Sequence, residues 1–140
     1  MVGALIAILV ALGHPASQPG PLVVYDKEGG VAGIREQLTV ARDGRATLRD
    51  GYGDDAPARR FRLTAAQLDH LRGVLEAAHL QRVRSSSGPG GCADCFGYEI
   101  RFGGVRVIAY ENAIAPALAQ PIALLDRLVA RGSSAPAGTR

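Results

Sequence analysis

The chain has 140 residues, of which 47% are hydrophobic and 21% charged, and its formal net charge is +3. This length corresponds to one ordinary domain and excludes a multidomain enzyme. The basic surplus is small and dispersed along the sequence, with eight basic and eight acidic side chains in residues 1–70 and eight and five in residues 71–140. Because phosphate binding requires a clustered basic face, we expect no nucleic-acid partner.

The first twelve residues are apolar and uncharged, and the stretch from Gly13 to Ser17 that follows is rich in small residues. This pattern favours a signal peptide over residues 1–17, with a buried first helix or strand as the alternative. We therefore expect a single domain over residues 18–132 of a secreted or extracytoplasmic protein, with no membrane span after processing. If the leader is not cleaved, the expected location is the cytoplasm.

The next part of the chain predicts an antiparallel meander. Three short apolar or alternating segments have the pattern of strands, at 22–27, 34–41 and 46–49. The first connection, at 28–33, contains three glycines, which indicates a turn with positive φ or a close backbone approach. The second, at 42–45, contains Asp-Gly, a strong signal for a hairpin.

A polar loop at 50–57 leads to an extended segment at 59–63 and then to a helix. The sequence Thr64-Ala65-Ala66-Gln67 is a capping box, in which the threonine hydroxyl and glutamine amide satisfy backbone groups reciprocally. Leucines at 68, 71 and 75 repeat at helical spacing, so the helix from here to His79 is expected to pack on the sheet through one face.

The last part of the chain predicts a hairpin and a second helix. Residues 96–102 and 105–110 alternate as strands around a Gly-Gly turn. Pro121 suits the first turn of a helix that Gly132 ends, and residues 133–140 are expected to form a disordered tail. The order of strands, helix, strands and helix predicts an α+β domain with two helices on one face of an antiparallel sheet.

Cys92 and Cys95 form a C-x-x-C motif in a glycine-rich loop. A thioredoxin-like site would place this motif at the start of a helix, whereas a strand pattern follows here. A zinc site would require four ligands. The sequence therefore favours a structural disulfide in an exported protein, with free thiols and metal or redox chemistry as alternatives.

The sequence shows no catalytic constellation. Its acidic residues mostly alternate with basic ones, and the two histidines beyond the leader, His70 and His79, lie nine positions apart on the predicted helix. At that spacing they point in opposite directions and cannot share a metal. We expect no enzymatic activity and no cofactor.

The glycine turn and its flanking strands resemble a known family. Residues 25–40 read YDKEGGVAGIREQLTV, which is similar to the strand, Gly-Gly-x-Ala-Gly-Ile turn and second strand of the emfourin family of protealysin inhibitors. The similarity continues in order through the capped helix, the segment at 94–100 and the closing segment at 116–128. It covers about residues 22–130.

This resemblance implies a small α+β protein that inhibits a thermolysin-like zinc metalloprotease by surface binding. The C-x-x-C motif, the apolar leader and the loop at 50–57 are not features of the founding pattern, and they indicate an exported branch whose partner is a secreted metalloprotease. A non-inhibitory secreted or cell-envelope binding module of the same fold is the alternative.

The glycine turn is the expected site of contact with a protease, because glycine lets a backbone approach a narrow cleft. Within it, Val31 supplies a small apolar anchor, and Asp94 in the glycine-rich loop supplies a carboxylate at a second contact. Hairpin geometry alone is an equally good explanation of the glycines. The predicted contact residues are Gly29, Gly30, Val31, Ala32, Gly33, Ile34 and Asp94.

Overall fold

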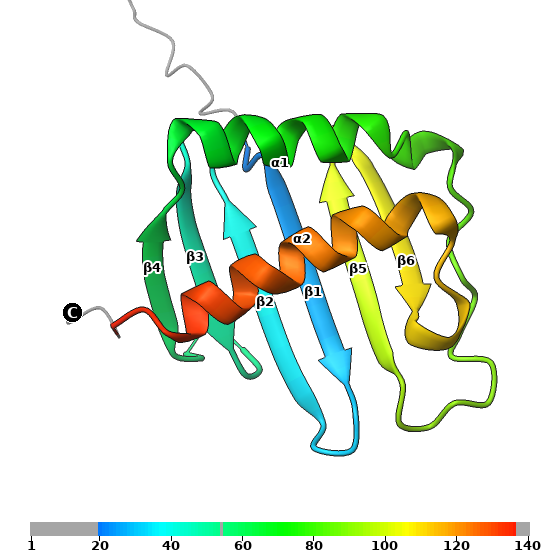
Figure 1. Ribbon diagram of the computed structural model, residues 1–140. Coiled ribbons are helices and arrows are strands. Elements are labelled where there is room, and N and C mark those ends of the chain that lie inside the picture. The colour runs from blue at the N-terminus through cyan, green and yellow to red at the C-terminus, as the bar shows by residue number, and fades with distance from the viewer. Residues whose placement is uncertain (1–19, 54, 137–140) are drawn as a thin grey trace, which may run out of the picture.

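A computed structural model describes residues 20–53 and 55–136. The signal peptide predicted at 1–17 and the last four residues of the predicted tail lie outside these ranges. Within them, six strands form one antiparallel sheet and two α-helices cover one of its faces (Figure 1), which confirms the predicted α+β fold.

The sheet has the strand order β4-β3-β2-β1-β5-β6, and all of its neighbouring strands are antiparallel. The first four strands form a continuous meander, one strand longer than the three that the hairpin signals predict. After the first helix, β5 pairs with β1 and β6 pairs back on β5. The elements are β1 (Val23–Gly29), β2 (Ile34–Val40), β3 (Arg45–Asp50), β4 (Ala58–Arg62), α1 (Ala65–Ala77), β5 (Phe96–Phe102), β6 (Val105–Tyr110) and α2 (Pro116–Ser133).

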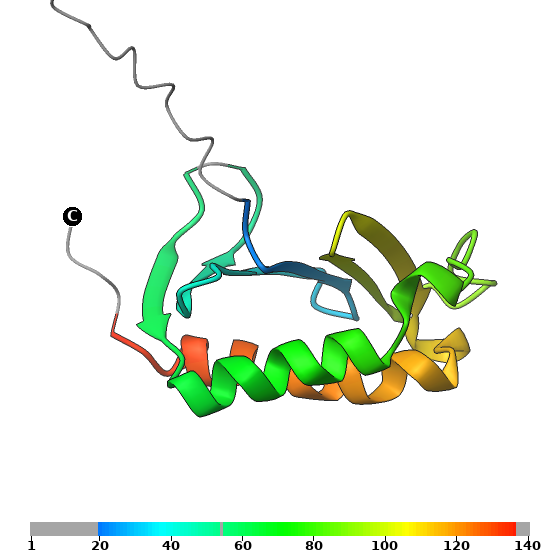
Figure 2. The same cartoon turned by 90° about the horizontal axis from the view of Figure 1, so that it is seen from above.

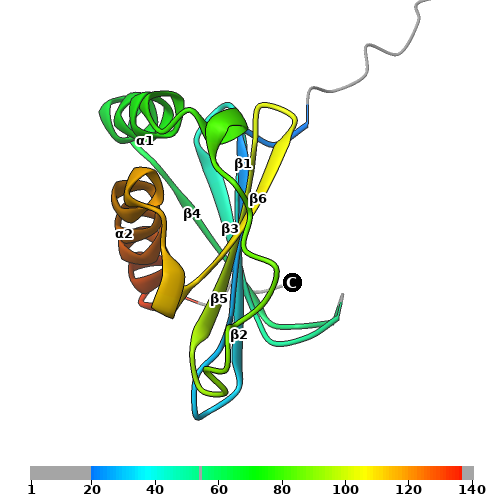
Figure 3. The ribbon, with the colours of Figure 1, turned by 90° about the vertical axis from the view of Figure 1, so that its right-hand side faces the viewer.

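The two faces of the sheet differ in polarity because side chains alternate along each strand. Both helices lie on the same side of the sheet, as the end-on and top views show (Figures 2 and 3). On the face toward the helices, Tyr25, Leu38 and Ile100 are almost fully buried. The opposite face, which we call the open face, carries mostly charged and polar side chains, among them Arg35 of β2 and Glu99 of β5. The hydrophobic core therefore lies between the sheet and the two helices.

Helix α1 begins as its capping box predicts. The Gln67 N–H donates to Thr64 Oγ1 at 3.2 Å, and the Thr64 N–H donates to Gln67 Oε1 at 2.9 Å. Leu71 and Leu75 on its inner stripe are buried. The helix ends before His79, which has a left-handed φ of +46° and leads into a short 3-10 turn that the sequence did not predict.

Helix α2 corrects two predictions made from proline and glycine. It begins at Pro116, so Pro121 lies inside the helix and not in its first turn. The missing N–H of Pro121 removes one helical hydrogen bond, but its ring is fully buried and contributes to the core. Gly132 does not end the helix, which continues through Ser133, so the prediction of a disordered tail is wrong at that residue.

Gly132 has a packing role in place of the predicted terminating one. A Cβ at this position would lie 2.7 Å from the ring of Phe61 and 3.1 Å from a methyl carbon of Leu48. Glycine therefore lets α2 approach β3 and β4 more closely than any other residue would allow.

Candidate functional site

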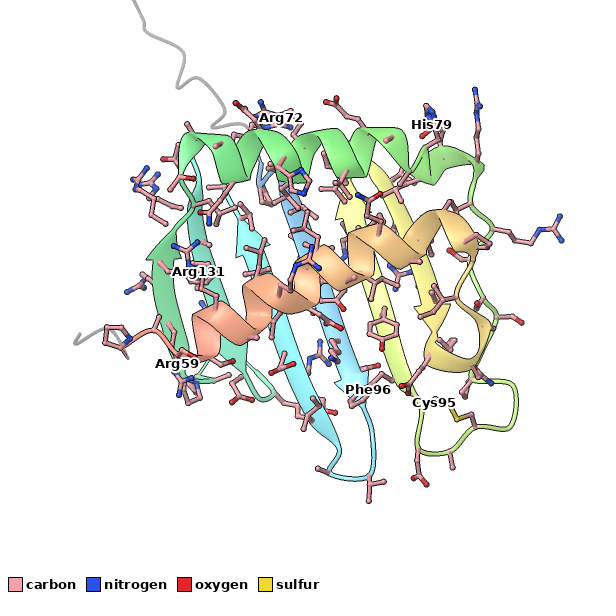
Figure 4. The ribbon with its side chains drawn as sticks, viewed as in Figure 1. Arg59, Arg72, His79, Cys95, Phe96 and Arg131 are labelled. Atoms are coloured by element: carbon pink, nitrogen blue, oxygen red, sulfur yellow. A yellow bond between two sulfur atoms is a disulfide. The ribbon has the colours of Figure 1, made fainter. Side chains whose placement is uncertain are left out.

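Three loops that are distant in sequence meet at one end of the sheet. They are the β1–β2 turn, the first part of the β3–β4 loop and the loop that precedes β5 (Figures 1 and 4). We call this region the turn end and define it as residues 29–33, 51–53 and 88–95. It contains all of the predicted contact residues except Ile34, which is the first residue of β2 and adjoins it.

The β1–β2 turn is built from glycines in conformations that other residues rarely adopt. Gly29, Gly30 and Gly33 have φ values of +111°, +72° and +58°, and the Gly33 N–H donates to the Gly30 carbonyl at 3.0 Å. This geometry places Val31 at the tip of the turn with 90% of its surface exposed. Ala32 beside it is also exposed.

Two of these glycines have a second role, because they contact the loop before β5. Gly29 pairs with Phe96 across the sheet, and a Cβ on Gly29 would lie 2.6 Å from the Cys95 carbonyl oxygen. A Cβ on Gly30 would lie 2.8 Å from the Phe96 ring. The close approach that glycine permits is therefore made within the chain at these two positions. The side chains that remain free at the tip belong to Val31 and Ala32.

The loop before β5 is closed by a disulfide between Cys92 and Cys95, whose Cα atoms are 5.4 Å apart. The disulfide predicted from the C-x-x-C motif is thus confirmed. The Cys92 N–H donates to the Pro89 carbonyl at 3.1 Å. Asn112 also donates from Nδ2 to that carbonyl, at 2.8 Å. Asp94 lies between the two cysteines with its side chain exposed.

Residues after β6 hold this loop in place, and sequence reasoning did not identify them. Glu111 and Asn112 belong to a single 3-10 turn, Glu111–Ala113. The carboxylate of Glu111 accepts a hydrogen bond from the Phe96 N–H at 3.2 Å, while Asn112 binds the Pro89 carbonyl. The turn therefore fixes both ends of the disulfide loop.

Tyr52 is the other exposed apolar side chain at the turn end, and the sequence analysis did not identify it. It is 67% exposed, and with Val31 it makes up the large hydrophobic side chains that stay exposed in the described ranges 20–53 and 55–136. The guanidinium carbon of Arg35 lies 5.0 Å from its ring centroid. The available signal was the sequence Gly51-Tyr52-Gly53, an aromatic residue between two glycines with positive φ.

A shallow cleft of about 330 Å³ lies between the glycine turn, Tyr52 and the disulfide loop. Its walls come from the glycine turn, the Tyr52 ring, the disulfide loop and Tyr110 of β6. Val31 and Tyr52 thus project next to a cleft of mixed polarity.

A partly buried polar cluster supports the turn end from the side of the helices. Asp126 of α2 accepts hydrogen bonds from the Tyr25 hydroxyl at 2.8 Å and from Lys27 Nζ at 3.2 Å. The same ammonium lies 4.7 Å from the Phe96 ring centroid, within the range of a cation–π contact. Burial, and then the neighbouring Asp126 carboxylate, raise the pKa of Tyr25, so this hydroxyl remains a donor at all ordinary pH values.

The described part of the chain contains no group of three or more His, Cys, Asp or Glu side chains placed to hold a metal ion. His70 and His79 are both exposed. No helix within residues 20–53 and 55–136 has the length and apolar character needed to cross a membrane.

Comparison with known proteins adds no family assignment. No protein-family model matches the chain, and no curated protein matches it in sequence.

Proposed function

We propose that this protein is a secreted, emfourin-like inhibitor of a thermolysin-like zinc metalloprotease, and that the turn end is its binding surface. The proposal rests on the ordered resemblance of residues 22–130 to the emfourin family and on one structural observation. That observation is the exposure of Val31 at the tip of a turn that the disulfide loop braces.

The bracing supports an inhibitory role because a rigid loop loses little conformational freedom when it binds. The glycine conformations, the pairing of Gly29 with Phe96 and the disulfide together restrict the β1–β2 turn before any partner arrives. Val31 then supplies a small apolar anchor, and Tyr52 supplies a larger contact at the rim. Binding of this kind blocks access to an enzyme's cleft without any chemical step by the inhibitor.

The disulfide is compatible with an extracytoplasmic location, since such bonds persist in oxidising compartments. In the proposed setting the partner is therefore a secreted metalloprotease. The inhibitor itself requires no metal and no cofactor for this mode of action.

The test is an inhibition assay with the purified protein and a panel of thermolysin-like enzymes, including any that is encoded next to its gene. Hydrolysis of a fluorogenic peptide is followed at inhibitor concentrations from about 1 nM to 10 μM. We expect at least one enzyme to be inhibited at submicromolar concentration, which corresponds to a binding free energy beyond about −8 kcal/mol. The absence of inhibition across the panel at 10 μM would overturn the proposal, and binding without inhibition would favour a non-inhibitory binding module.

A further inference from the structure

Strands β3 and β4 concentrate positive charge that is dispersed along the sequence. Together they contain five arginines and one acidic residue, a net charge of +4, which exceeds the +3 of the whole chain. The fold produces this concentration because a hairpin places 45–50 and 58–62 side by side. The arginines are Arg45, Arg49, Arg59, Arg60 and Arg62.

Strand β4 is also an edge of the sheet, since β3 is its single neighbour. The Leu63 N–H donates to the Gly44 carbonyl, and the Asp50 N–H donates to the Pro57 carbonyl. In an antiparallel pair the residues that exchange hydrogen bonds alternate, so the odd-numbered residues of β4 bond to β3. The N–H and C=O groups of residues 58, 60 and 62 therefore point away from the sheet.

These outward groups are largely available in the described ranges of the chain. The Arg62 carbonyl accepts a hydrogen bond from Arg131 Nη2 at 3.2 Å. The structure gives no partner for the outward backbone groups of Ala58 and Arg60 within residues 20–53 and 55–136. An edge of this kind can accept one more strand.

The side chains along this edge determine which strand it accepts. Arg60 and Arg62 project from alternate positions on the open face, and both are exposed. Arg62 donates from Nη1 to the Asp43 carbonyl at 3.0 Å. The backbone hydrogen bond from Arg45 lowers the pKa of the Asp43 carboxyl, and the charges of Arg45 and then Arg62 help to lower it. Arg59, on the other face, donates to the Ser133 carbonyl at the end of α2. A strand that adds here therefore meets the positive side chains of Arg60 and Arg62 on the open face.

We propose that the β4 edge binds an extended, acidic segment of a partner polypeptide as a seventh strand of the sheet. The peptide backbone pairs with Ala58, Arg60 and the Arg62 N–H. Acidic side chains at every second peptide position lie opposite Arg60 and Arg62 on the open face. Opposite charges on directly paired strands stabilise such an arrangement, whereas like charges oppose it.

The geometry favours a peptide over the other anionic partners. A second copy of this chain would bring its own arginine-rich edge against β4, which is a repulsive pairing. Single-stranded nucleic acid is bound by rows of aromatic side chains on which bases stack. Strands β3 and β4 contribute no aromatic side chain to the open face, because Phe61 lies on the side of α2. The unpaired backbone beside the arginines is a feature that a peptide strand uses and a phosphate backbone does not.

The first experiment measures binding of a dye-labelled ten-residue peptide that alternates Thr and Glu, by fluorescence anisotropy with the purified protein. We expect saturable binding that weakens at least about tenfold in the variant R60E/R62E. The matched control R82E/R84E makes the same change of charge at two exposed arginines beyond α1 and is expected to bind as the unmodified protein does. If R60E/R62E is not folded by circular dichroism, R60Q replaces it, because Arg60 is exposed and forms no ion pair in the described residues.

The second experiment separates strand addition from general attraction between charges. A Thr-Glu peptide with N-methylated backbone at two central Glu residues keeps its charge but loses the N–H groups that would pair with β4, and we expect it to bind at least about tenfold more weakly. Hydrogen exchange at the Arg60 and Arg62 amides is expected to slow when the Thr-Glu peptide binds, while exchange at Arg59 and Phe61, which already bond to β3, stays unchanged. The proposal is overturned if the N-methylated peptide binds equally well, if a short DNA duplex binds tighter than the Thr-Glu peptide at the same salt concentration, or if no peptide binds at 1 mM. These outcomes are independent of protease inhibition.

Discussion

Substitution of Gly29 by alanine tests whether the glycine turn and the disulfide loop depend on each other. At this position φ is +111°, and the added Cβ would lie 2.6 Å from the Cys95 carbonyl oxygen, so the backbone of one loop must move. Gly33 supplies the matched control, because its φ of +58° is also unfavourable for alanine while a Cβ there meets no atom within 4 Å. Strain in φ alone costs about 1 kcal/mol at Gly33. Strain and the backbone clash together cost about 3 kcal/mol or more at Gly29.

Urea unfolding of G29A and G33A, followed by circular dichroism, gives the two losses of free energy of unfolding directly. With an m value near 1.5 kcal/mol/M, a difference of 2 kcal/mol moves the midpoint by about 1.3 M, which is easily measured. The reasoning is refuted if the two variants differ by less than about 0.5 kcal/mol. It would then follow that the two loops adjust freely to each other and that the turn is not braced.

Three further predictions concern the core and the open face. G132A should lower the free energy of unfolding by about 1–2 kcal/mol, because its Cβ would lie 2.7 Å from the Phe61 ring. G73A in α1, where an added Cβ meets no atom within 4 Å, should raise the free energy of unfolding by up to about 1 kcal/mol, and thermal unfolding compares the two variants. Y25F should cost about 2 kcal/mol in urea unfolding through loss of the hydrogen bond to Asp126, and a decrease below 0.5 kcal/mol would contradict that role. The hydrogen bond from Arg106, with further help from Arg101, lowers the pKa of Glu99, so this carboxylate contributes stability at neutral pH that is lost as the pH falls below 4.5. E99Q should therefore be less stable than the unmodified protein at pH 7 and should approach it at pH 3 in parallel unfolding titrations.

The parts of the fold that depend on neighbouring residues were predictable from the sequence. The capping box at Thr64, the Asp-Gly hairpin and the Gly-Gly turn each specify a local geometry through residues within four positions of one another. Strands β5 and β6 have the predicted boundaries because alternation and the turn between them agree. The α+β class then follows from the order of the elements.

The features that the sequence did not predict depend on contacts between distant residues. Pro121 lies inside α2, where its buried ring contributes to a core built by the whole sheet. Gly132 also lies inside the helix, at a position where Phe61 and Leu48 leave no room for a side chain. In both cases tertiary packing outweighs the local preference of the residue. The pairing of Gly29 with Phe96 also joins segments that are far apart in sequence, since β5 adds to the sheet beside β1.

The candidate site shows the same division between local and distant information. The exposure of Val31 at a glycine turn was an expectation from local sequence, and the structure places 90% of its surface in solvent. Tyr52 and the turn at Glu111–Ala113 reach the same end of the sheet through the topology alone. The concentration of arginines on β3 and β4 likewise becomes visible when their hairpin is formed.

The most direct test of the central claim is the inhibition constant of V31D against an enzyme that the unmodified protein inhibits. Since Val31 is 90% exposed, the substitution should leave the melting temperature within about 2 °C, yet it should raise the inhibition constant at least about tenfold, or 1.4 kcal/mol. Q81D places the same new charge at an exposed position beyond α1 and should change neither quantity. If V31D inhibits as well as the unmodified protein while A93D in the disulfide loop abolishes inhibition, the glycine turn is a structural support and the binding surface lies elsewhere on the turn end.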